Sequence, residues 1–375
     1  MTTSSEEQWL LVSSYLHRNR YSLAVKAADE YPASARLAGT PLLAAAQWRL
    51  SAPIPLDSIR LEFRPRAAPP EVPDVASLTP YALPERADGT RYPRYSSAIE
   101  ALARPAVFEN RSTYRLLSAN LLGAPREAGG DPRLGFTRGR FFDGVDVGGP
   151  AGHEYAAAQL GLIDRCAYRE AFGDPTDLAV RSSAVATSAL TLRYDRAAGT
   201  ATFPMHLRDA ALVGHAGGLY QVIPVGIFQP SGEAPWNEAP DFDLWRGLLR
   251  EYAEELLGAS EDYGSEEAPI DYGAWPLAKA MTDGLGDGSV RAYCLGLGTD
   301  PLTFAMDLLA VVVIDAPLYD ELFGGIVTDN AEGRVISPRP FDESTITELT
   351  TKSPLQAAAA ALLTLAIEHR EVLLS

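Results

Sequence analysis

The chain has little cysteine and no long apolar runs. Its 375 residues include two cysteines, Cys166 and Cys294, which are too few for a disulfide framework and indicate reduced thiols in the core. No stretch approaches the roughly 20 apolar residues that a membrane-spanning helix requires. The first nine residues lack the basic and apolar regions of a signal peptide. We therefore expect a cytoplasmic protein with no membrane partner.

Basic residues are also scarce. Lysine and arginine together number 32, aspartate and glutamate number 49, and the formal net charge is −17. A nucleic-acid surface needs clustered cations to neutralise phosphates, so we expect no direct nucleic-acid partner. Only three of the basic residues are lysines. This bias towards arginine is typical of a GC-rich bacterial genome.

Several common catalytic patterns are missing. The five histidines show neither an H-x-H nor an H-E-x-x-H spacing, so the sequence does not predict a zinc site. We interpret two of them, His206 and His215, first as structural residues and second as substrate contacts. The sequence has no G-x-S-x-G elbow of a serine hydrolase. Gly296-x-Gly298 lacks the third glycine of a dinucleotide loop and is interpreted as a turn.

Residues 243–258 combine a strong helical period with concentrated carboxylates. The leucines and Tyr252 of this stretch recur at the spacing of one apolar helical face, which predicts a packed helix. Glu251, Glu254 and Glu255 fall at i, i+3 and i+4, where their oxygens could converge on one hard cation. The alternative is a solvated helix face, on which Arg250 and Glu254 form an ordinary pair worth only about 0.3–0.5 kcal/mol.

The order of residues in this predicted helix resembles a known sequence motif. The run Arg-Glu-Tyr-Ala-Glu-Glu at residues 250–255 is similar to the R-E-apolar-x-E-E centre of the Nudix box, the metal-binding helix of Nudix hydrolases. The opening G-x5-E of the box corresponds to Gly232 and Glu238, but eleven residues then precede Arg250 where the box has seven. Two residues separate Glu255 from Gly258, where the box has one.

The surrounding pattern fits the same family. Alternating or β-rich runs predict strands at residues 189–194, 200–207, 217–226, 290–297 and 308–315, and residues 354–370 predict a closing helix. The third run ends in Pro-x-Gly, where the family commonly has Pro-Gly-Gly. The resemblance implies an α+β protein in which residues 175–375 form a Nudix-like α/β/α sandwich with a mixed sheet, preceded by a smaller α+β region.

The resemblance also implies roles for individual residues. Glu251, Glu254 and Glu255 would hold Mg²⁺ or Mn²⁺, Arg250 would orient them, and Glu238 would serve as a ligand or base. The implied activity is hydrolysis of a nucleoside diphosphate linked to another group. Aromatic side chains in the flanking loops are candidates for holding this small nucleotide-type ligand, with Trp245 equally assignable to the core: Tyr220, Phe228, Trp236 and Trp245.

A second resemblance predicts a different function. Residues 108–117, 222–224, 228–230 and 294–298 are similar to the sensor half of bacterial regulators in which a helix-turn-helix precedes a Nudix-like domain. The DNA-binding domain is absent from this chain. The alternative is therefore a catalytically silent, Nudix-like ligand-binding or regulatory protein, and a homodimer stays open as its assembly.

The N-terminal half divides into three segments. Residues 1–64 predict a small unit with helices at 6–19 and 21–31 and a strand at 59–63, and its balanced charge argues against a helix-turn-helix. Residues 65–95 contain seven prolines and are interpreted as an extended arm or linker. Residues 96–174 form an intermediate α+β region.

Within that intermediate region we expect a helix at residues 97–103 and the edge of a small sheet at 111–122. Residues 123–152 are rich in glycine and are interpreted as a surface loop, followed by an amphipathic helix at 152–162. Alternating acidic residues and glycines around Asp143 and Asp146 could also wrap a calcium ion, although their spacing matches no EF-hand.

Overall fold

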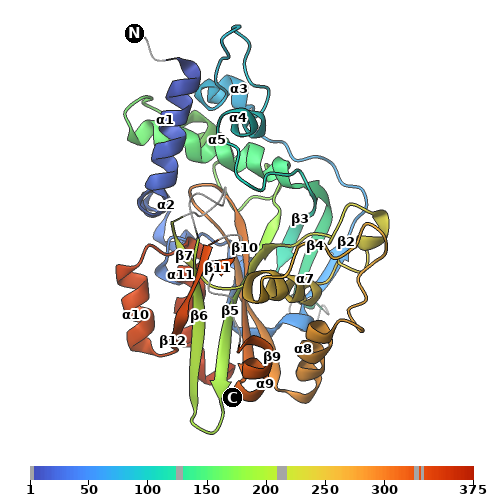
Figure 1. The fold of residues 1–375 in the computed structure, drawn as a ribbon. Helices are drawn as coiled ribbons and strands as arrows, with labels where there is room; N and C mark the ends of the chain where they lie inside the picture. Colours follow the sequence, from blue (N-terminus) through green and yellow to red (C-terminus); the bar gives the residue numbers. More distant parts are fainter. Residues whose placement is uncertain (1–3, 124–129, 209–217, 325–328, 331–332) are drawn as a thin grey trace.

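The computed structural model describes residues 4–123, 130–208, 218–324, 329–330 and 333–375, so His215 lies outside the described residues. A layer of N-terminal helices stands beside one large and one small sheet (Figure 1). The chain is therefore a mixed α+β protein, as the sequence predicts. Within the described part, no helix combines the length and the apolar character needed to cross a membrane.

The large sheet is mixed and open. Its order is β1-β9-β10-β5-β6-β12-β11, with β7 paired to β6 and β8 paired to β5. β10 and β5 are parallel, and the other pairs are antiparallel. The strands are β1 (Arg49–Pro55), β5 (Val185–Asp195), β6 (Thr200–Arg208), β7 (Tyr220–Gln221), β8 (Val225–Ile227), β9 (Val290–Thr299), β10 (Met306–Asp315), β11 (Asp329–Asn330) and β12 (Gly333–Pro340). Four of the five predicted strands are confirmed, whereas residues 217–226 contribute two short strands with different partners.

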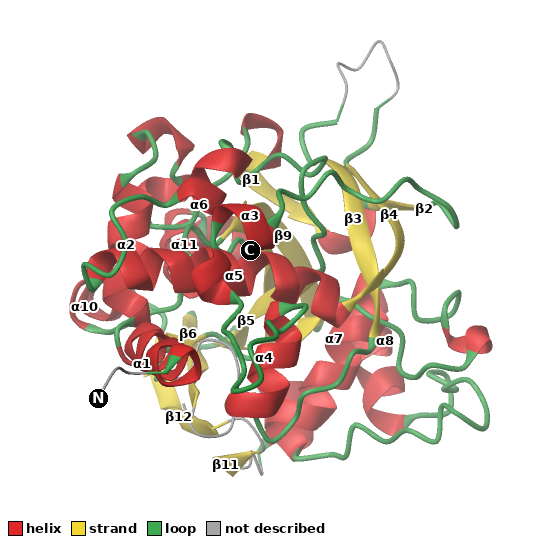
Figure 2. Cartoon of the chain, turned by 90° about the horizontal axis from the view of Figure 1, so that it is seen from above, coloured by secondary structure: helices red, strands yellow, loops and turns green. Residues whose placement is uncertain are grey.

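Helices cover both faces of this sheet. The residues of β10 are buried along nearly the whole strand, as expected for a strand packed on both sides. Figure 2 shows α11 (Ala357–Glu368) on one side of the strands and α7 (Leu244–Glu251) with α8 (Pro276–Asp287) on the other. The predicted closing helix is thus confirmed as α11. It is flanked by α10 (Glu343–Lys352) and α12 (Arg370–Leu373), whereas α9 (Ala316–Phe323) packs on the face of α7 and α8, where Phe323 lies against Tyr252.

β5 changes its partner along its length. Residues 193–195 pair with β6, whereas residues 186–188 pair with β8. Between these two pairings, the Thr191 hydroxyl donates to the Ile223 carbonyl at 2.8 Å and lies 2.8 Å from the Tyr252 hydroxyl. The opening between β5 and β6 is therefore the place where the chain that continues α7 docks onto the sheet.

The small sheet has the order β2-β4-β3, formed by β2 (Arg60–Phe63), β4 (Arg133–Arg140) and β3 (Ser112–Asn120). β3 is an edge strand, which confirms the prediction for residues 111–122. The Leu116 amide donates to the Ser183 carbonyl at 2.8 Å, just before β5. Tyr114 also stacks near Phe228, with ring centroids 4.7 Å apart. Hydrogen bonds and aromatic packing thus join the small sheet to the large one.

The described part of the glycine-rich stretch contains β4 and the first part of α5 (Phe141–Gln159), so its interpretation as a loop is wrong for residues 133–152; residues 124–129 lie outside the described residues. α5 begins where the Asp143 carboxylate accepts the Arg140 amide at 2.9 Å. A Cβ at Gly148 would lie 2.1 Å from the Thr303 carbonyl oxygen, and one at Gly149 would lie 2.2 Å from the Tyr95 ring. These glycines allow close helix packing, and the acids around them belong to a helix and not to a calcium-binding loop.

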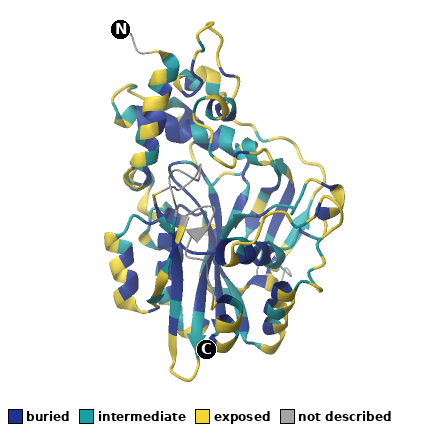
Figure 3. Cartoon of the chain, in the orientation of Figure 1, coloured by how far each residue is buried: buried dark blue, intermediate teal, exposed yellow. Residues whose placement is uncertain are grey.

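The proline-rich segment is also more than a linker. It contains a short helix, α3 (Val75–Leu78), and it supplies buried side chains to the helical layer. Trp9 of α1 donates its indole N–H to the Ala82 carbonyl at 3.1 Å, and Leu83 and Tyr92 pack in the same cluster. The segment therefore begins beside the small sheet, where Arg138 and Arg115 donate to the carbonyls of Pro65 and Ala68, and is anchored farther on to the core of the helical layer. Figure 3 shows that much of it is exposed.

The N-terminal helices match their predictions, but the segment does not stand alone. α1 (Ser5–Arg18) and α2 (Arg20–Asp29) pack with α4 (Tyr95–Leu102), α5 and α6 (Ala167–Phe172). β1, which belongs to residues 1–64, pairs with β9 of the large sheet. The predicted boundaries at residues 64, 95 and 174 remain predictions, although the sheet of residues 175–375 includes this N-terminal strand.

Candidate functional site

The glutamate helix folds as the apolar period predicts. The Asp243 side chain caps α7 by accepting the Arg246 amide at 3.0 Å. The apolar side chains of the helix are buried against the sheet: Leu244, Leu248, Leu249, Tyr252 and Leu256. The apolar face of the helix thus packs on the sheet, and the glutamates follow at its C-terminal end.

The helix does not stay regular through the motif. α7 ends at Glu251, and residues Tyr252–Leu256 form a π-helical turn. A π turn closes i→i+5 hydrogen bonds and is wider than an α turn, so residues three apart no longer lie on one side. The prediction that Glu251, Glu254 and Glu255 share one face assumed α-helical spacing. In the structure, Glu254 separates from the other two.

Glu255 faces β8. Its Oε1 accepts the Val225 amide at 2.8 Å, and its Oε2 lies 3.6 Å from Nδ1 of His206 on β6. Both side chains are buried. Glu255 therefore bridges the end of the helix and the two strands that diverge at the opening in the sheet.

Glu251 lies against the next residue of the same strand. A Cβ at Gly226 would fall 1.7 Å from the Glu251 Oε1 and 2.3 Å from its Oε2. Because such an approach is too close for any side chain, the carboxylate occupies space that only a glycine leaves open. Glu251 and Glu255 thus reach adjacent residues of β8, and we refer to these two residues as the carboxylate pair.

Glu254 has a different neighbour. The Tyr263 hydroxyl donates to Glu254 Oε1 at 2.7 Å and lies 3.2 Å from the Arg250 carbonyl oxygen. Burial and the adjacent Glu254 raise the pKa of Tyr263, so this hydroxyl remains a donor at neutral pH. Among the described residues, no group of three or more acidic, histidine or cysteine side chains gathers closely enough to hold a metal ion. A three-carboxylate site stays a prediction.

Arg250 binds the loop that leads into the helix. Its guanidinium contacts the Asp241 carboxylate at 3.2 Å, the Gln229 carbonyl at 2.6 Å and the Tyr272 hydroxyl. Burial opposes its charge, but the neighbouring Tyr272 and Asp241 outweigh that effect and raise the pKa of Arg250. Arg250 therefore fixes residues 229–241 onto the helix, and the nearby charge of Glu251 also favours its charged form.

Asp241, and not Glu238, contacts Arg250 of the helix, so the role of Glu238 as a ligand or base stays a prediction. Glu238 pairs with Arg138 of β4 in the small sheet, with Nη2 to Oε1 at 2.7 Å. Asp241 instead accepts hydrogen bonds from Arg250, Tyr272 and the Ser231 amide. The sequence contained a sign of this contact: eight residues separate Asp241 from Arg250, close to the seven that separate the glutamate from the arginine in the Nudix box.

The aromatic candidates are dispersed. Phe228 is 2% exposed and packs among Tyr114, Phe136 and Phe242. Tyr220 is half-buried on β7, and its carbonyl accepts the amide that precedes α11. Trp236 is 46% exposed and donates to the Ser265 carbonyl at 3.0 Å, and Trp245 donates to Thr282 of α8 at 3.1 Å. The exposed ring of Trp236 is the most accessible of the four.

Comparisons with protein-family models and with curated proteins identify no relative of this chain. No protein-family model matches the chain, and a comparison with curated proteins finds no match. The functional argument therefore depends on the helix of residues 243–258 and on the side chains around it.

Proposed function

We propose that the chain is a Nudix-type, metal-dependent hydrolase that cleaves a nucleoside diphosphate linked to another group. The observation that supports this most is the carboxylate pair: Glu251 and Glu255 lie four residues apart and reach adjacent residues of β8. The pair lies where β6 and β8 pair with different parts of β5. This arrangement suits a small, highly charged substrate whose phosphate oxygens would supply further ligands to a metal ion.

The donors present fit a divalent cation. Mg²⁺ is usually bound through one or two carboxylates together with water and substrate phosphates, so a pair suffices. A bound Mg²⁺ or Mn²⁺ would neutralise charge on the diphosphate and lower the pKa of an attacking water. Gly226 leaves the space in which the Glu251 carboxylate lies. With a net charge of −17, the chain has little other means of attracting an anionic substrate.

A substrate panel tests the proposal. ADP-ribose, nucleoside diphosphate sugars, dinucleotides and nucleoside triphosphates would be incubated with Mg²⁺ or Mn²⁺, and phosphorylated products would be separated by chromatography. We expect cleavage of at least one diphosphate linkage, abolished by a chelator. If no member of the panel gives a metal-dependent product while one of them binds tightly, the hydrolase proposal is wrong.

Gly226→Ala tests the carboxylate pair directly. The added methyl group would meet the end of a flexible side chain, so the free energy of unfolding should change by no more than about 1 kcal/mol. The displaced Glu251 carboxylate should weaken Mn²⁺ binding roughly tenfold in calorimetry. Gly247→Ala on α7 is the matched control, because its Cβ would lie at an ordinary 3.7 Å from Phe228. Equal Mn²⁺ affinity in both variants would remove Glu251 from the site.

A second candidate function is supported by the hydrogen bonds of the glutamates. Glu254 accepts the Tyr263 hydroxyl, and Glu255 accepts the Val225 amide. Each bond occupies one oxygen of a carboxylate without a cation, which favours a catalytically silent ligand-binding or regulatory protein. Calorimetry of the panel with and without a chelator separates the two functions, since a silent protein should bind its ligand equally well in both.

A further inference from the structure

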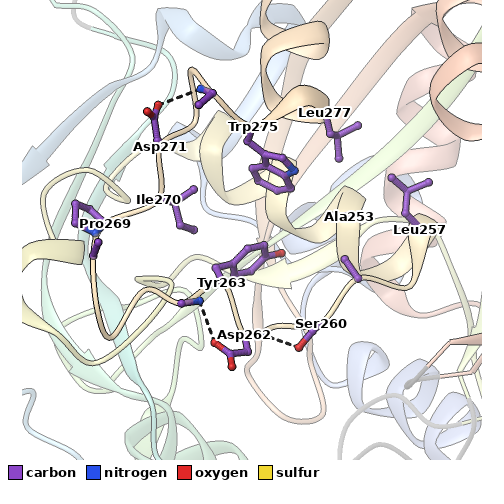
Figure 4. A pocket seen from close by; sticks show the side chains of 14 residues that line it. Ala253, Leu257, Ser260, Asp262, Tyr263, Pro269, Ile270, Asp271, Trp275 and Leu277 are labelled. Carbon is purple, nitrogen blue, oxygen red and sulfur yellow. Dashed lines mark hydrogen bonds between the residues drawn. The ribbon is translucent and has the colours of Figure 1, made fainter.

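An open cavity of about 650 Å³ lies beside the glutamate helix, between the π-helical turn, the start of α8 and the loop of residues 259–274 (Figure 4). Cavities that bind small molecules commonly have volumes of about 300–1,000 Å³. Ala253 and Leu257 form one wall and Leu277 of α8 extends it. Pro269 and Ile270 close the opposite side. The lining is thus largely apolar.

Two aromatic rings are held in this cavity. Tyr263 and Trp275 have ring centroids 5.6 Å apart and planes tilted by 57°. The Tyr263 hydroxyl is fixed by Glu254 and the Arg250 carbonyl. The Trp275 amide donates to the Asp271 carbonyl at 3.0 Å, which sets the start of α8. The two rings therefore present fixed π faces and edges to a ligand.

The charge of the cavity selects the kind of ligand. Asp262 and Asp271 line it, and none of the described lining residues is basic. The loop of residues 259–274 contains five acidic residues and no lysine or arginine. An anion such as a nucleotide phosphate would meet only negative charge here. A cation would gain from the carboxylates and from the negative faces of the aromatic rings.

We propose that this cavity binds an organic ammonium ion, with its apolar substituents against Leu257 and Leu277 and its charge near Tyr263, Trp275 and the two aspartates. The site is separate from the carboxylate pair, because Ala253 and Leu257 lie on a different side of the helix from the face that Glu251 and Glu255 turn to β8. The proposal therefore stands whether or not the chain is a hydrolase.

The charge preference is tested with two probes of the same shape. Choline carries a trimethylammonium group, and 3,3-dimethyl-1-butanol replaces the nitrogen by carbon and has no charge. Each would be titrated into the full chain while the indole N–H signal of Trp275 is followed by NMR, with assignment from Trp275→Phe. We expect choline to bind in the millimolar range and at least about tenfold more tightly than the alcohol. Equal affinities, or no shift of the Trp275 signal with choline, would overturn the proposal.

Leu257 offers a pair of variants with opposite charge. Its side chain is 37% exposed on the wall of the cavity, so both Leu257→Lys and Leu257→Glu should fold. We expect the lysine to weaken choline binding roughly tenfold and the glutamate to preserve or strengthen it. The effect on helix stability has the opposite order: a lysine is favourable at the C-terminus of a helix and a glutamate is not, so a loss of binding in Leu257→Lys would not come from a less stable helix. Val372→Lys, on α12 and outside the cavity, should leave the affinity unchanged, and unchanged binding in Leu257→Lys would contradict the proposal.

Discussion

Glu251→Gln is expected to lower metal-dependent turnover of a diphosphate substrate by roughly 10²–10³-fold, because a metal ion contributes several kcal/mol to such a reaction. The amide keeps the size of the side chain and its place beside Gly226, so the loss would come from charge and not from packing. The measurement is kcat and KM with the cleaved member of the substrate panel, at saturating Mg²⁺.

Glu254→Gln is the matched control. Glu254 bonds to Tyr263, away from the carboxylate pair, so its replacement should lower turnover by no more than about tenfold. Circular dichroism would verify that both variants are folded. If Glu254→Gln were as damaging as Glu251→Gln, all three glutamates would act together as the sequence predicts, and the pair would be the wrong description of the site.

Asp241→Ala is expected to reduce the free energy of unfolding by about 3–5 kcal/mol. Asp241 and Arg250 have side chains exposed by 1% and 6%, so removal of the carboxylate leaves a buried guanidinium without its anion. The Tyr272 hydroxyl and the Ser231 amide would lose their acceptor at the same time. Urea unfolding followed by circular dichroism measures the change, which is a large part of the 5–15 kcal/mol of a typical domain.

An exposed ion pair provides the comparison. Lys279 and Asp283 of α8 are both more than half exposed, and Asp283→Ala should cost less than about 1 kcal/mol. A similar small loss for Asp241→Ala would mean that Arg250 finds other partners or water, and that the loop of residues 229–241 is not fixed by this pair.

Local patterns predicted much of the fold. The strands β5, β6, β9 and β10 and the helices α1, α7 and α11 each carry a clear period, and the structure confirms them. The spacing of residues along the chain was less informative where tertiary packing determines the secondary structure. Gly148 and Gly149 weaken a helix by intrinsic propensity, yet α5 forms because Thr303 and Tyr95 approach its backbone there.

The candidate site was predicted only in part, for a similar reason. The glutamates could be found from their spacing, but their neighbours could not: Tyr263 comes from a loop without a period, and His206 and Gly226 come from strands earlier in the chain. Glu238 was assigned because it completes a motif with Gly232, and Asp241 was not considered. The ion pair between Glu238 and Arg138 depends on the small sheet, which no local pattern places beside that loop.

The π-helical turn at Tyr252–Leu256 accounts for one departure from the family motif. Gly258 stands one residue later than in the usual box, and a single π turn absorbs one inserted residue without changing the direction of the helix axis. The π turn and the later glycine are then a single feature of this helix, one residue more than regular α-helical spacing would place before Gly258. Deletion of Leu257 is expected to return the segment to α-helical spacing and to bring Glu254 back towards Glu251 and Glu255.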